Sequence, residues 1–149
     1  MSSTDMANLM EDLWKRLGMS AVPLVGDACT LALGDDVEVE IALEGGVVML
    51  TCDLGPLPAH PDYALALMLL RANAPDGDGQ LFRVGADVAG RLVLWAAPAL
   101  GIIDAEALEM FLDELPGRVR SLRAALAGDE PEIDMSPAPV DAAEVLVRI

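Results

Sequence analysis

The chain has 149 residues, and its 25 acidic and 9 basic side chains give a formal net charge of −16. This length fits one domain, and a hydrophobic share of 54% with only 3% aromatic residues predicts an aliphatic core. The acidic balance argues strongly against binding to nucleic acid or to an anionic membrane surface, because both need a basic footprint. Such charge can serve solubility alone, or it can favour a basic partner and keep an apolar surface soluble.

The N-terminal part of the chain predicts one helix followed by three strands. Apolar residues recur at helical spacing from Met6 to Leu17, and Gly18 is placed to end the helix. Three strand-like runs follow, separated by short turns that contain glycine: residues 29–33, 37–43 and 47–54. The second run alternates apolar residues with glutamates, which is typical of a half-buried strand with an acidic outer face. Short turns between consecutive strands favour an antiparallel meander.

The rest of the chain predicts a second helix, a hairpin and a third helix. The second helix begins near Pro61, which suits a first helical turn, and continues to about Asn73. The hairpin comprises residues 81–84 and 91–97. The last helix begins after Asp104, a predicted N-cap, and ends at Gly128. Its apolar face continues across Pro116, so one kinked helix is expected.

These elements predict an α+β fold with an antiparallel sheet in the order α-β-β-β-α-β-β-α, within a single domain that covers residues 1–128. Residues 129–149 form an acidic, proline-containing tail that is expected to be mobile. No secretory signal is recognisable at the N-terminus, and no apolar run approaches the roughly 20 residues that cross a bilayer. We therefore expect a cytoplasmic protein without membrane insertion.

Two segments are apolar on every side, although an element at a domain surface should show a polar face. They are the helical run from Tyr63 to Leu70 and the strand from Leu92 to Ala97. One explanation is that the second and third helices cover both faces of this strand within one chain. The other, which the small size of the domain favours, is a symmetric second copy. On that hypothesis the homodimer interface contains Leu65, Leu67, Met68, Leu69, Leu92 and Leu94.

No pattern in the chain predicts a catalytic residue, a cofactor or a metal site. His60, the only histidine, has no Cys, Asp or Glu at the spacing of a triad or a zinc site. Cys29 and Cys52 lie in apolar, strand-like runs and are interpreted as buried free thiols. Residues 76–79 begin like a calcium loop, but Leu81 stands where such a loop requires glycine. The acidic residues at 35, 36, 38 and 40 are interpreted as a charged outer face. We expect a protein that is not an enzyme.

Four stretches of the chain have a recognisable order and spacing. They are Leu13-Trp14-Lys15-Arg16-Leu17-Gly18, the strand pair at 29–33 and 37–41, Leu54-Gly55-Pro56-Leu57-Pro58 followed by a helix that ends in Leu69-Leu70-Arg71-Ala72-Asn73, and Leu100-Gly101-Ile102-Ile103-Asp104. Together they resemble the class I type III secretion chaperone family, over roughly Met6 to Leu126. The ending of the second helix is the most specific of these motifs. Pro116 and the acidic tail depart from the family pattern.

The resemblance implies a cytosolic homodimer without enzymatic activity, around which the N-terminal segment of a secreted effector wraps in extended form. It places this client across the first helix and the first sheet, where a broad apolar stripe rich in Met suits varied side chains. The residues expected to bind the effector are Met6, Leu9, Leu13, Val39, Ile41, Val48 and Leu50. The alternative for these seven is that they are ordinary core residues between helix and sheet.

Two other functions stay open from the sequence. A regulatory or structural protein of the same fold would bind a folded partner, such as a transcription regulator or a component of the export machinery. The second alternative is an enzyme whose site residues are dispersed in the sequence. The lack of a recognisable nucleophile, base or metal cluster in the sequence argues against this alternative. Co-purification separates the first from an effector chaperone, because a chaperone should retain the unfolded N-terminal part of a secreted protein.

Overall fold

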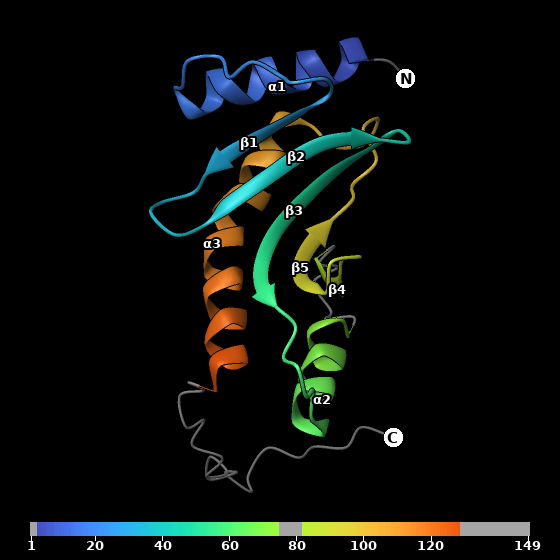
Figure 1. Ribbon diagram of the computed structural model, residues 1–149. Helices are drawn as coiled ribbons and strands as arrows, with labels where there is room; N and C mark the ends of the chain where they lie inside the picture. The colour runs from blue at the N-terminus through green and yellow to red at the C-terminus, as the bar shows by residue number, and fades with distance from the viewer. Residues whose placement is uncertain (1–2, 75–81, 129–149) are drawn as a thin grey trace, which may run out of the picture.

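The computed structural model describes residues 3–74 and 82–128 (Figure 1). Within these ranges, three helices and five strands follow one another in the predicted order, which confirms the α+β fold. The helices are α1 (Ser3–Leu17), α2 (Tyr63–Ala72) and α3 (Ala105–Ala127). The strands are β1 (Ala28–Ala32), β2 (Glu38–Glu44), β3 (Val47–Pro56), β4 (Arg83–Ala86) and β5 (Arg91–Ala96). The tail predicted to be mobile at 129–149 and the rejected calcium loop at 76–79 lie outside the described residues.

The five strands form one antiparallel sheet in the order β1-β2-β3-β5-β4. The first three strands are consecutive neighbours, so the predicted meander is confirmed. Gly45 and Gly46 join β2 to β3 with φ angles of 57° and 85°. These left-handed values give a tight turn whose twist matches that of the strands, and glycine adopts them without steric strain. Strand β5 pairs with β3, which leaves β4 at the edge opposite β1.

The late hairpin begins later than the sequence predicted. Strand β4 occupies Arg83–Ala86 rather than residues 81–84, and Val84 lies opposite Leu94 in its register with β5. The side chain of Asn73, at the end of α2, donates to the Val84 carbonyl at 2.9 Å and accepts from the Val84 N–H at 2.7 Å. This pair of hydrogen bonds links α2 to β4 and sets the position of β4 along the chain, which hydrophobic alternation alone did not predict.

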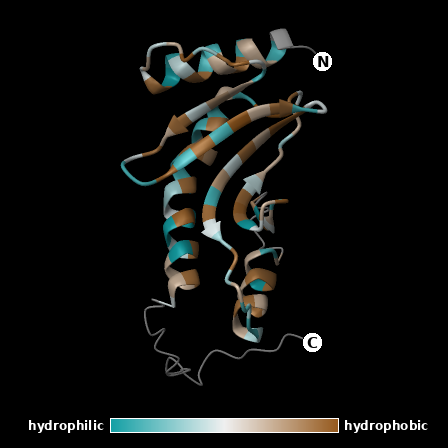
Figure 2. Cartoon of the chain, in the orientation of Figure 1, coloured by the Kyte–Doolittle hydropathy of each residue, from teal (hydrophilic) through white to brown (hydrophobic). Residues whose placement is uncertain are grey.

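Helices α1 and α3 pack on the same side of the sheet, and in Figure 1 α3 passes behind the strands. The core forms there because alternate strand residues point toward the helices, for example Val48, Leu50 and Cys52 on β3. Figure 2 shows this alternation as hydrophobic and hydrophilic positions along β2. Residues that point to the opposite side of β2 and β3 are mostly exposed or half-buried. Among the residues that the structure describes, the sheet therefore has one covered face and one open face.

The ends of α1 and α3 follow the predicted capping residues. At Gly18 (φ 63°) the Met19 N–H donates to the Trp14 carbonyl at 3.0 Å, which closes α1 in a left-handed cap. Asp104 accepts from the Ala107 N–H at 2.8 Å at the start of α3.

Pro116 does not split α3, which is a single helix of 23 residues that ends at Gly128 (φ 77°). The buried residues of α3 lie on both sides of the proline: Leu108, Leu112, Leu115 and Val119. Their packing against the sheet offsets the backbone hydrogen bond that proline cannot make.

Candidate functional site

Helix α2 is almost entirely apolar, yet none of its residues is buried. Its sequence, YALALMLLRA, has a single charged residue, Arg71, in the last turn. Tyr63 and Leu70 are 80% and 70% exposed. Asp62 caps the helix by accepting a hydrogen bond from the Leu65 N–H at 2.8 Å. The helix is therefore well defined, but it presents hydrophobic surface that the described part of its own chain does not cover.

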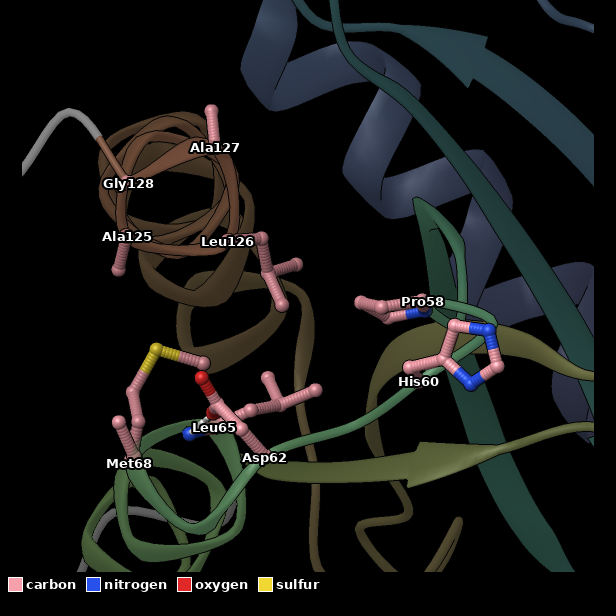
Figure 3. A pocket seen from close by; sticks show the side chains of 10 residues that line it. Pro58, His60, Asp62, Leu65, Met68, Ala125, Leu126, Ala127 and Gly128 are labelled. Carbon is pink, nitrogen blue, oxygen red and sulfur yellow. Dashed lines mark hydrogen bonds between the residues drawn. The ribbon is translucent and has the colours of Figure 1, made fainter.

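Two hollows lie between α2 and α3. The first has a volume of about 410 Å³ and separates the first turns of α2 from the last turn of α3 (Figure 3). In that view Leu65 and Met68 of α2 lie across from Leu126 of α3. The second, of about 580 Å³, lies further along α3 and is lined by Ala72, Phe82, Val84, Leu94, Glu114, Gly117, Arg118, Ser121 and Leu122. The apolar side chains of α2 thus border open space on the side that faces α3.

The open face of the sheet is also partly apolar. Strand β5 turns Val93 and Trp95 to this face, and β3 turns Met49 and Thr51 to it, all half-buried. Thr51 lies directly opposite Trp95 in the register of β3 and β5. A sheet face that carries a half-buried tryptophan and a half-buried methionine, and that no described element covers, is suited to contact with another chain.

The residues predicted for the homodimer interface fall into two groups. The four on α2 lie half-buried at the surface: Leu65, Leu67, Met68 and Leu69. Leu92 and Leu94 are only 1% and 2% exposed. The alternation of β5 points these two into the core and leaves Val93 and Trp95 to face outward, so their place at the dimer interface stays a prediction.

The residues predicted to bind the effector are all brought together, but inside the core. Met6, Leu9, Leu13, Val39, Ile41, Val48 and Leu50 are each 9% exposed or less. The physical reason is that the wide apolar stripe of α1 packs against α3 and shares one core cluster with the inward residues of β2 and β3, so α1 itself occupies the place expected for a groove. Effector contact at these seven positions stays a prediction, and the surface available around them is made by other residues.

The chain contains one histidine, His60, and two cysteines, Cys29 and Cys52. Among the described residues there is no group of three or more side chains suited to hold a metal. His60 is exposed and lines the hollow in Figure 3. Burial raises the pKa of Cys29 and raises the pKa of Cys52 to about 11. Both thiols are therefore protonated and poorly nucleophilic near neutral pH.

Three arginines that the sequence analysis did not single out fasten elements of the fold together. Arg120 pairs with Asp36 at 2.8 Å, and Arg123 donates to the backbone carbonyls of Asp36 and Asp53 at 2.7 and 2.8 Å. Arg91 pairs with Asp53. Hydrogen bonds from Arg120 and Arg91 hold the pKa values of the Asp36 and Asp53 carboxyls below their usual range. No local sequence signal identifies these pairs, because their partners are far apart in the chain.

The model of the Tir chaperone protein (CesT) family matches residues 8–123. The chain belongs to the CesT family. The match begins within α1, ends in the last turns of α3, and includes every described element between them. A comparison with curated proteins found no match. In the described residues, none of the helices has the length and hydrophobicity needed to span a membrane.

Solved structures show that the CesT-family fold is shared with proteins of type III secretion. A chain in the heterodimeric ExoU-SpcU complex from the type III secretion system of Pseudomonas aeruginosa is 25% identical, with a TM-score of 0.66 over 76% of this chain and 94% of that chain. The Yersinia pestis type III secretion chaperone SycH, in complex with a fragment of YscM2, gives 16% identity and a TM-score of 0.65, over 78% of this chain and 98% of that chain. A chain of the HopA1-SchA chaperone-effector complex is 16% identical, with a TM-score of 0.68 over 83% of this chain and 96% of that chain. At 16% identity, the last two likenesses show the fold alone.

Proposed function

We propose that this CesT-family protein is a cytoplasmic chaperone that binds the extended N-terminal segment of a type III secreted effector and keeps that effector soluble and competent for secretion. The observation that carries the proposal is the family match over residues 8–123. The 25% identity to a chain of the ExoU-SpcU complex, which comes from a type III secretion system, supports it.

The proposal assigns no catalytic step to the protein. Its family is one of chaperones, and the exposed His60 and the protonated, buried Cys29 and Cys52 offer no activated nucleophile or base. Recognition then rests on apolar area and hydrogen bonding to an extended segment. Such a segment loses conformational entropy when it binds, so a large apolar surface is required.

A second copy of the chain is the proposed cover for α2. Its exposed Tyr63 and Leu70, its half-buried leucines and the outward Val93 and Trp95 of β5 supply the hydrophobic area. A stable interface buries about 800 Å² on each partner. A symmetric dimer lets one self-complementary patch satisfy both chains. The dimer also doubles the surface around which an extended client can wrap.

The client is proposed to lie across the outer surfaces of α1 and the β1–β3 meander. The buried residues of this region hold the shape of the surface, and their outward neighbours are available to the client. Strand β1 is an edge of the sheet in the described chain, so its backbone can accept an added strand. A net charge of −16 keeps the remaining apolar surface soluble when no client is bound.

The proposal is tested by purifying a tagged, full-length protein from its native cell and identifying what is retained by mass spectrometry. Limited proteolysis then maps the protected segment. Recovery of a secreted protein whose N-terminal segment is protected, while the rest is digested at its usual rate, is the expected result. Retention of a folded regulator or export component with no protected extended segment would replace the proposal with the regulatory function of the same fold.

A further inference from the structure

Strand β2 carries a row of glutamates on the open face of the sheet. Glu38, Glu40 and Glu44 are exposed, and none of the three has an ion pair within residues 3–74 and 82–128. Their cross-strand neighbours are small or uncharged. Glu40 lies between Thr30 of β1 and Thr51 of β3. Within the described part of the chain, the three carboxylates of this row are therefore exposed to a partner.

The basic residues of the chain do not balance this row. Of nine Lys and Arg residues, Arg148 lies outside the described part, which leaves eight. Seven of these eight contact acidic groups or backbone carbonyls within the fold: Lys15, Arg16, Arg83, Arg91, Arg118, Arg120 and Arg123. The charge left for a partner on the described surface is consequently negative. The complement of such a surface is a segment that carries Lys or Arg.

An apolar hollow adjoins the glutamate row. It has a volume of about 430 Å³ and is lined by Val22, Pro23, Val25, Ala28, Cys29, Thr30 and Glu40. Val25 is 83% exposed at its rim, and Glu40 is the charged member of the lining. The hollow is formed where the segment after α1 crosses the edge strand β1, and Val25 pairs with Ala28 there. An apolar anchor and a carboxylate thus lie side by side.

From these observations we infer that the client segment is cationic and amphipathic: an apolar side chain enters the hollow beside Pro23 and Val25, and neighbouring Lys or Arg residues pair with Glu40 and Glu38. This inference rests on the proposed chaperone function and names the class of segment that the function requires. Glutamates two apart on a strand point to the same side, so an extended client can match them with every second residue. We assign this site to a client segment rather than to a second copy, because a second copy is equally acidic and would place like charge opposite the glutamates.

The test uses the full-length protein and two synthetic peptides that share an alternating leucine–serine frame and carry either Lys or Glu at the same three positions. Fluorescence anisotropy measures their affinities for the wild type, for E38Q/E40Q, and for a control on α3, Glu106→Gln with Asp113→Asn. Each double variant removes two exposed negative charges. The wild type should prefer the Lys peptide, and E38Q/E40Q should weaken its binding by about threefold to tenfold, while the control stays near the wild type. Added salt should weaken binding to the wild type more than to E38Q/E40Q.

A third variant tests the apolar part of the site. Val25→Ser should weaken both peptides by a similar factor, because it removes an exposed apolar contact without changing charge. Equal binding of the Lys and Glu peptides by the wild type, or equal losses in E38Q/E40Q and the control, would overturn the inference. A change of sedimentation in E38Q/E40Q would assign this face to a second copy and overturn it too. These peptide measurements do not test whether a secreted protein co-purifies with the chain. If no secreted protein co-purifies, the proposed chaperone function is refuted, whatever the peptides show.

Discussion

The exposed face of α2 gives the sharpest test of the proposed dimer. Leu70 is 70% exposed, so Leu70→Glu removes no core contact and should leave the folded chain intact. Complete burial of a leucine side chain contributes about 1.5–3 kcal/mol. Scaled by the exposed fraction, this gives about 1–2 kcal/mol for each copy and about 2–4 kcal/mol for a symmetric pair. The dimer dissociation constant should therefore rise by roughly 30-fold to 700-fold, before the added charge is counted.

Sedimentation velocity across a dilution series, with circular dichroism on the same samples, measures this effect. The matched control is Val25→Glu, which places the same charge at an 83% exposed aliphatic position beside β1. The control should remain as dimeric as the wild type, and both variants should keep the wild-type spectrum. A wild type that sediments as a monomer at micromolar concentration, or an L70E dimer as tight as the wild type, would refute the argument from α2.

Three further predictions concern the core, the thiols and one ion pair. Ile41→Asp puts a charge in the core and should abolish the circular dichroism of the folded state; a folded dimer that has lost its client would instead show that Ile41 contacts the client. Cys52→Ala should still retain the client. In the wild type, the raised folded pKa of Cys52 means that its contribution to stability is complete below pH 9.0 and is lost as pH rises toward about 11, which urea titrations across that range can follow. Arg120→Gln should lower the urea midpoint at pH 7, and this loss should shrink as the pH falls below the ordinary carboxyl pKa of 3.8, because Asp36, whose folded pKa is lowered, contributes stability above its unfolded pKa and loses it as pH falls; a loss that stays constant through the acid range would contradict this.

The order of elements could be predicted because its signals are local. Gly18 and Asp104 act as caps through their own backbone or side chain, and Gly45-Gly46 makes a turn through its own φ angles. The apolar periodicity of α1 and α3 and the alternation of β2 likewise lie within single elements. The start of β4 was misplaced because its position depends on the Asn73 side chain, which belongs to another element.

The candidate surfaces were harder to predict, because burial is a property of how elements meet. The sequence marked α2 as unusually apolar, and the structure shows it without a buried residue. The same reasoning chose Leu92 and Leu94 on β5, where the outward residues are Val93 and Trp95. An all-apolar strand has no alternation in its sequence, so nothing in it distinguishes the two faces.

By itself, the sequence determined the number and order of the elements, the caps and tight turns, the acidity, and the resemblance to secretion chaperones that the family match bears out. The elements, caps and turns depend on residues that are adjacent or one helical turn apart, and the acidity and the resemblance follow from composition and the order of such local motifs. Only the tertiary structure decided that Met6, Leu9 and Leu13 of α1 are buried in the core, that Arg120 and Arg123 link α3 to Asp36 and to β3, and that Glu40 borders an apolar hollow. These facts depend on contacts between residues that are remote in the chain, and hydrophobicity and charge along a sequence do not specify which remote residues will meet.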